Sequence, residues 1–83
     1  MRVKICGITR LEDALLAEAL GAFALGFVLV PGSRRRIAPE AARAIGEALG
    51  PFVVRVGVFR NQPPEAVLSL MEEARLQVAQ LHG

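Results

Sequence analysis

The sequence repeats one pattern, a short apolar run followed by a segment of helical character, at intervals of about 21 to 28 residues. The four apolar runs lie at residues 3–6, 24–30, 52–59 and 78–81. Strands that alternate with helices predict right-handed βαβ units on a parallel sheet, with each helix covering one face of the sheet. The pattern therefore predicts an α/β fold.

Residues typical of helix ends follow the first apolar run. Thr9 and Glu12 have the spacing of a capping box, so Thr9 is expected to cap a first helix over residues 11–20. Gly21 would end this helix in the left-handed conformation. Its buried side chains are expected to be Leu11, Leu15, Ala14 and Ala19.

Two more helices are predicted between the later runs. Pro39 suits the first position of a second helix that ends at Gly50 and Pro51, although Ala38 offers no capping oxygen before it. A third helix would begin at Pro63 or Pro64. The expected buried stripes are Ala41, Ala44, Ile45 and Ala48 in the second helix, and Ala66, Val67, Leu70 and Met71 in the third.

Counting by two along the runs assigns side chains to the two faces of the sheet. The face expected under the helices carries Val3, Ile5, Leu25, Phe27, Val54, Val56 and Val58. The other carries Lys4, Cys6, Gly26, Val28, Arg55, Gly57, Gln80 and His82. This second face is too polar to lie under helices and suits the inside of a closed barrel, where carboxylates of further strands would pair its cations.

Composition excludes several classes of function. Ten basic and eight acidic residues are scattered along the chain, and a formal net charge of +2 predicts neither nucleic acid nor membrane as a partner. The sequence shows no signal peptide and no apolar stretch of membrane-spanning length. A single cysteine cannot form an internal disulfide, so a reducing cytoplasm is the expected location.

That cysteine, Cys6, lies where the first strand is expected to lead into the first helix. The positive end of a helix favours the thiolate, which is the form that acts as a base or nucleophile. A single cysteine is equally often a small buried hydrophobe, and position alone leaves both interpretations open.

Five segments in order resemble the phosphoribosylanthranilate isomerase family of tryptophan biosynthesis. They are Lys4-Ile5-Cys6-Gly7-Ile8-Thr9 with Leu11-Glu12-Asp13-Ala14, then Leu25-Gly26-Phe27-Val28, Ser33-Arg34-Arg35, Arg55-Val56-Gly57-Val58-Phe59 and Gln80-Leu81-His82-Gly83. The resemblance implies a (βα)8 TIM barrel, of which residues 1–83 would be an incomplete, N-terminal portion holding the first three βα units and the fourth strand.

The resemblance also implies a reaction, the Amadori rearrangement of N-(5-phosphoribosyl)anthranilate, which needs no cofactor and no metal. Cys6 matches the cysteine that serves as general base in this family. The general acid is an aspartate of a later strand, beyond Gly83, and Asp13 does not replace it because it falls on the solvent side of the first helix. The 83 residues alone are therefore expected to be inactive.

Further site residues follow from the same resemblance. Arg35 matches an arginine that would bind the anthranilate carboxylate, although Arg34 and Arg36 flank it and leave open which guanidinium does so. Without the resemblance, a solvated basic loop is the commoner interpretation. Gln80 and His82 would line the barrel top and support the site. The partner is a small phosphorylated aminosugar, and a homodimer is possible.

Two other functional classes compete with this interpretation. Another phosphate-binding barrel would share the βα repeats, but Cys6 followed by Gly-Ile-Thr argues against it. A small open-sheet α/β binding module, for which a non-catalytic fragment of the enzyme is a separate alternative, would need a covered last strand and a crevice lined by acids. The sequence predicts neither feature.

Overall fold

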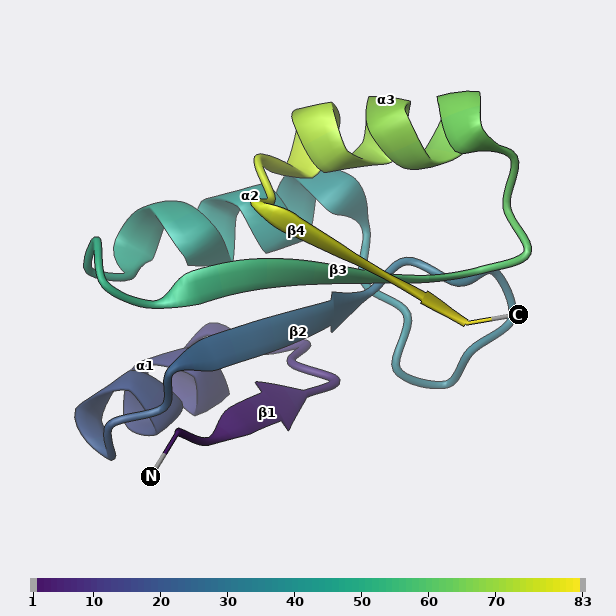
Figure 1. Cartoon of the computed structure of the whole chain (residues 1–83). Coiled ribbons are helices and arrows are strands. Elements are labelled where there is room, and N and C mark those ends of the chain that lie inside the picture. The colour runs from purple at the N-terminus through teal and green to yellow at the C-terminus, as the bar shows by residue number, and fades with distance from the viewer. Residues whose placement is uncertain (1, 83) are drawn as a thin grey trace.

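A computed structural model describes residues 2–82, which form four strands and three helices in strict alternation (Figure 1). The elements are β1 (Lys4–Cys6), α1 (Leu11–Ala19), β2 (Ala24–Val28), α2 (Pro39–Ala48), β3 (Val54–Arg60), α3 (Pro64–Ala74) and β4 (Val78–His82). The strands pair in parallel in the order β1-β2-β3-β4. The predicted α/β fold of consecutive βα units is confirmed.

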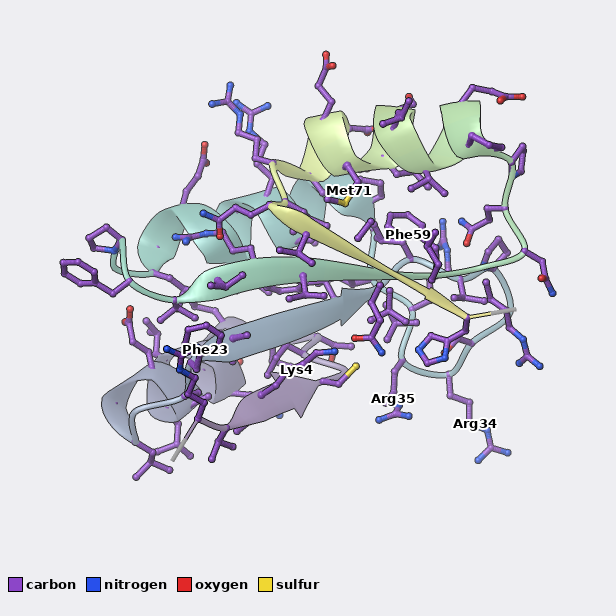
Figure 2. All side chains as sticks on the ribbon, viewed as in Figure 1. Lys4, Phe23, Arg34, Arg35, Phe59 and Met71 are labelled. Carbon is purple, nitrogen blue, oxygen red and sulfur yellow. The ribbon has the colours of Figure 1, made fainter. Side chains whose placement is uncertain are left out.

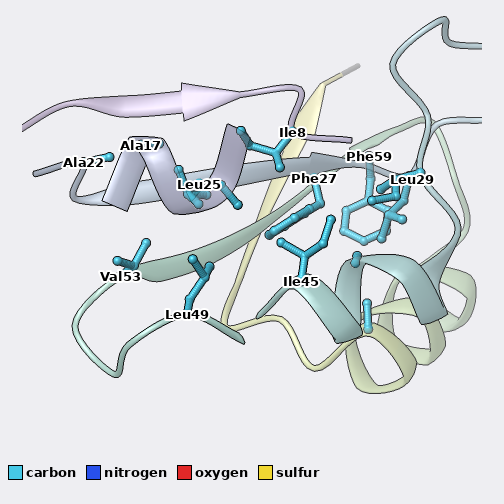
Figure 3. Packing of buried hydrophobic residues seen from close by; sticks show 14 residues of the cluster. Ile8, Ala17, Ala22, Leu25, Phe27, Leu29, Ile45, Leu49, Val53 and Phe59 are labelled. Carbon is cyan, nitrogen blue, oxygen red and sulfur yellow. The ribbon is translucent and has the colours of Figure 1, made fainter. Parts of the chain in front are cut away.

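The hydrophobic core lies between the sheet and its helices. Leu25 and Phe27 of β2 and Phe59 of β3 are the largest fully buried side chains. Figure 3 shows Leu25 and Phe27 pointing from β2 toward Ile45 and Leu49 of the α2 segment. Full burial of each large side chain contributes about 1.5 to 3 kcal/mol, so this apolar layer holds the three helices against one face of the sheet.

The opposite face of the sheet is concave and carries polar side chains. Lys4, Cys6, Gly26 and Val28 share this face, and so do Gln80 and His82, as predicted. The sheet curls so far that Lys4 Nζ donates a hydrogen bond to Gln80 Oε1, although β1 and β4 are not neighbours.

The predicted faces of β3 are wrong. The observed register pairs Val56 with Gly26 and Val58 with Val28, which puts these valines on the concave face. Arg55, Gly57 and Phe59 therefore lie on the helix-covered face. The alternation of valines misled the prediction because the lower part of a barrel interior is as apolar as the face under the helices.

Arg55 is accommodated under the helices by backbone carbonyls. Its Nη1 donates to Val53 O at 2.7 Å and its Nη2 donates to Gly46 O at 2.7 Å, with longer bonds to the oxygens of Leu49 and Gly50. The guanidinium thus satisfies carbonyls at the C-terminal end of α2, where a positive charge is favourable.

The start of α1 differs from the prediction. Arg10, not Thr9, occupies the N-cap position, and no side chain caps the helix. Ala14 is buried as expected, but Leu11 is 42% exposed and Leu15 is 41% exposed. Gly21 follows the helix with a φ of +88°, as predicted.

The other two helices begin where the prolines predicted. Pro39 opens α2 behind Ala38, which makes no side-chain cap bond, and Pro64 opens α3. The buried residues of α2 are Ala42, Ile45 and Gly46, so only Ile45 of the predicted stripe is correct. The predicted stripe of α3 is confirmed as partly buried: Ala66, Val67, Leu70 and Met71.

Candidate active site

A hollow of about 670 Å³ lies on the concave face, toward the carboxyl ends of the strands. It contains all four site residues predicted from the sequence. The full lining consists of Lys4, Cys6, Val28, Val30, Ser33, Arg35, Val58, Phe59, Arg60, Gln80 and His82. The carboxyl ends of parallel strands are where TIM barrels place their chemistry, so this hollow is the candidate active site.

Cys6 is the last residue of β1, and its thiol is exposed in the hollow. The backbone N–H groups of Gly7 and Ile8 both donate to Gly26 O, at 3.0 and 3.1 Å, which anchors the end of β1 to β2. A β-carbon on Gly26 would lie only 3.0 Å from Cys6 Sγ. The thiol is therefore positioned by a glycine, and its exposure does not support the interpretation as a buried hydrophobe.

Arg35 reaches the hollow from the loop after β2. Its backbone N–H donates to Ser33 Oγ at 3.2 Å, which shapes the loop. Its side chain packs against Gly7, beside the end of β1, and Figure 2 shows it nearer to β1 than Arg34. Of the three consecutive arginines, only Arg35 lines the hollow, while Arg34 and Arg36 do not.

Gln80 and His82 lie two residues apart on β4 and meet in the hollow. Gln80 Nε2 is 2.8 Å from His82 Nε2, and Gln80 Oε1 accepts the hydrogen bond from Lys4. The three side chains form one continuous chain across the concave face. The sequence placed them on this face but did not indicate that they contact one another.

Arg60, the last residue of β3, also lines the hollow, and sequence reasoning missed it. It is the register partner of His82. The wrong face assignment for β3 hid Arg60, because counting by two from Val56 and Val58 puts Arg60 on the face expected under the helices. The correct alternation of β3 would have identified it.

The charges in the hollow are of one sign. Its ionisable lining within residues 2–82 consists of three cations, Lys4, Arg35 and Arg60, together with Cys6 and His82, and contains no carboxylate. Asp13 instead lies on the exposed side of α1 and pairs with Arg10, the N-cap residue, at 3.5 Å. Such a site attracts an anionic ligand and offers a thiol as base, but it lacks a carboxylic acid.

Residues 2–82 contain no group of three or more histidine, cysteine or acidic side chains that could hold a metal ion. Within the same range, none of the helices has the length and apolar character that a membrane crossing requires.

Comparison with known proteins places these features in a family. The N-(5'phosphoribosyl)anthranilate (PRA) isomerase family model matches residues 3–83. The N-(5'-phosphoribosyl)anthranilate isomerase of Thermotoga maritima is 55% identical over 83 residues, which are all of this chain and 40% of that protein. The chain therefore spans about 40% of the length of the curated relatives it matches.

Solved structures agree with the sequence matches. The phosphoribosyl anthranilate isomerase of Thermus thermophilus superposes with a TM-score of 0.99 at 95% identity, over all of this chain and 42% of that one. A second isomerase was solved in complex with reduced 1-(o-carboxyphenylamino)-1-deoxyribulose 5-phosphate. It superposes with a TM-score of 0.97 at 55% identity, over all of this chain and 43% of that one. The sheet and helices are thus the first βα units of a TIM barrel, and the chain belongs to the phosphoribosylanthranilate isomerase family.

Proposed function

We propose that the protein carrying these residues is an isomerase of tryptophan biosynthesis. It converts N-(5-phosphoribosyl)anthranilate into 1-(2-carboxyphenylamino)-1-deoxyribulose 5-phosphate. The observation that carries this proposal is the single hollow in which an exposed thiol, Cys6, and a guanidinium, Arg35, meet at the strand ends. Family membership and the relative solved with a reduced form of that product support the same reaction.

The reaction needs one acid and one base. A general acid protonates the ring oxygen, the bond between C1 and that oxygen breaks, and the nitrogen lone pair forms a C1–N double bond. Cys6, as thiolate, then removes the proton from C2. The electron pair of the C2–H bond forms a C1–C2 double bond, the C1–N π electrons return to nitrogen, and the resulting enolamine tautomerises to the ketone. No carboxylate of residues 2–82 lines the hollow, so we assign the acid to an aspartate outside these residues.

Arg35 would hold the anthranilate end of the substrate. A guanidinium matches a carboxylate in bidentate geometry, and fixing the far end of the substrate orients C2 toward the thiolate. Gln80 and His82 would support the site from β4. The three cations of the hollow suit a substrate that carries both a carboxylate and a phosphate.

Substitution of these two residues in the full-length protein tests the proposal. Cys6→Ala should lower kcat by roughly 10² to 10⁴, because the base is lost, and leave KM nearly unchanged. Arg35→Met should instead raise KM, whereas its neighbour Arg34, which does not line the hollow, serves as the matched control in Arg34→Met. Turnover by Cys6→Ala at the wild-type rate would disprove the assignment of the base.

The remaining assignments are part of the same proposal. We infer that residues 1–83 are the N-terminal portion of one barrel domain and that the enzyme works in the cytoplasm. A homodimer stays a prediction, which the mass of the full-length protein in solution would test.

A further inference from the structure

The hydrogen bonds of Lys4, Gln80 and His82 determine one another's direction. Lys4 Nζ carries only donors, so the Gln80 atom that it contacts must be the acceptor, Oε1. The other end of the amide, Nε2, is then the atom 2.8 Å from His82 Nε2. An amide nitrogen can only donate, so the ring nitrogen facing it must accept.

We propose that Lys4 and Gln80 are positioning residues that hold His82 as the neutral tautomer protonated on Nδ1. Lys4 orients the amide, and the amide occupies the lone pair of Nε2. The ring then has one N–H to offer, on Nδ1, and no free lone pair with which to remove a proton. His82 is a hydrogen-bond donor in this site and not a second base beside Cys6.

The composition of the chain fits this role for Lys4. It is the only lysine among ten basic residues, the other nine being arginines. A compact ammonium on a flexible stem reaches across the concave face from β1 to β4, where it contacts a single oxygen. A planar guanidinium is suited instead to paired oxygens, such as those of a carboxylate.

The role of the donor rests on the proposed function, whereas the tautomer does not. If the protein binds a sugar substrate, the Nδ1–H of His82 is available to a hydroxyl or carbonyl oxygen of the open chain. The tautomer can be measured on the free protein without substrate. Failure of the isomerase proposal therefore leaves this measurement intact, and failure of this measurement leaves the isomerase proposal intact.

The test measures the two ¹⁵N chemical shifts of the His82 ring by NMR, near neutral pH, in the full-length protein that carries these residues. The signals are assigned by their loss in His82→Gln. A protonated Nδ1 and an unprotonated Nε2 are expected in the wild type. Lys4→Met keeps the apolar stem but frees the amide to rotate, which should shift the tautomer ratio toward Nε2–H by roughly two- to tenfold.

Two further variants make the test specific. Gln80→Glu presents an acceptor to Nε2, so it should move the proton onto that nitrogen. Arg60→Met removes a cation from the hollow at the register partner of His82, without breaking the Lys4 to Gln80 bond, and should leave the tautomer unchanged. A wild type protonated on Nε2, or a Gln80→Glu variant with unchanged ring signals, would overturn the proposal, even if Lys4→Met failed to fold.

Discussion

Arg35 crosses the backbone of Gly7 so closely that a β-carbon on Gly7 would lie 2.7 Å from Arg35 Cδ. Gly7 follows the candidate base and adopts a φ of +90°, which side-chain-bearing residues rarely adopt. The loop after β1 and the loop after β2 therefore position one another at this point. The distance between thiol and guanidinium, and with it the orientation of a bound substrate, depends on the absence of one methyl group.

Gly7→Ala should consequently affect both stability and binding. Forcing alanine to a positive φ costs about 1 to 3 kcal/mol in the free energy of unfolding. The new methyl also displaces Arg35, so KM for a carboxylate-bearing substrate should rise about tenfold or more, as expected for a lost charge-assisted hydrogen bond. Denaturant unfolding and steady-state kinetics measure the two effects separately.

Gly21→Ala is the matched control for this prediction. Gly21 has nearly the same φ, +88°, but a β-carbon there would meet nothing within 4 Å. This variant should lose a similar amount of stability and keep its KM. An equal rise of KM in both variants would mean that strain alone, and not contact with Arg35, weakens binding.

Gly26→Ala should act on the thiol and not on the arginine. Its new β-carbon would lie 3.0 Å from Cys6 Sγ and 3.3 Å from Cys6 Cα, while no strained φ is involved. Because the thiol must move or change rotamer, we expect a lower kcat and a changed rate of Cys6 alkylation, with KM nearly constant. An unchanged alkylation rate together with an unchanged kcat would show that the site tolerates the shift.

The sequence predicted the order of the elements better than their faces. Pro39, Pro64 and Gly21 act through their own backbone restrictions, so their positions could be interpreted without tertiary information. The alternation of Val56 and Val58 shows that one face of β3 is apolar. It cannot show whether that face lies under the helices or lines the barrel interior, because both surfaces are apolar. The contacts of the site are also tertiary, so the bond between Lys4 and Gln80 could not be predicted.

Arg55 was predicted to line the barrel and instead stabilises the end of α2. Arg55→Met should lower the free energy of unfolding by about 1 to 3 kcal/mol, because it leaves the half-buried carbonyls of Gly46 and Val53 without their donor. Kinetic constants should not change, since Arg55 lies on the face opposite the hollow. Urea unfolding measures the stability loss.

Arg43→Met is the control for Arg55, because it removes an arginine that forms only an exposed pair with Glu47, at 3.4 Å. Exposed pairs of this spacing on a helix are worth about 0.3 to 0.5 kcal/mol. A loss in Arg43→Met as large as that in Arg55→Met would mean that general charge, and not the carbonyl contacts, accounts for the effect.

A purified polypeptide of residues 1–83 should not isomerise the substrate at a measurable rate. The hollow of residues 2–82 contains the proposed base, Cys6, and the proposed anion-binding residue, Arg35, but no carboxylic acid to protonate the ring oxygen. Without that proton the ring does not open, and C2 does not become acidic enough for Cys6 to act. The measurement is a fluorescence or absorbance assay of product at high polypeptide concentration, with the full-length protein as positive control. Turnover by the 83-residue polypeptide that disappears in its Cys6→Ala variant would contradict this prediction and show that these residues suffice for catalysis.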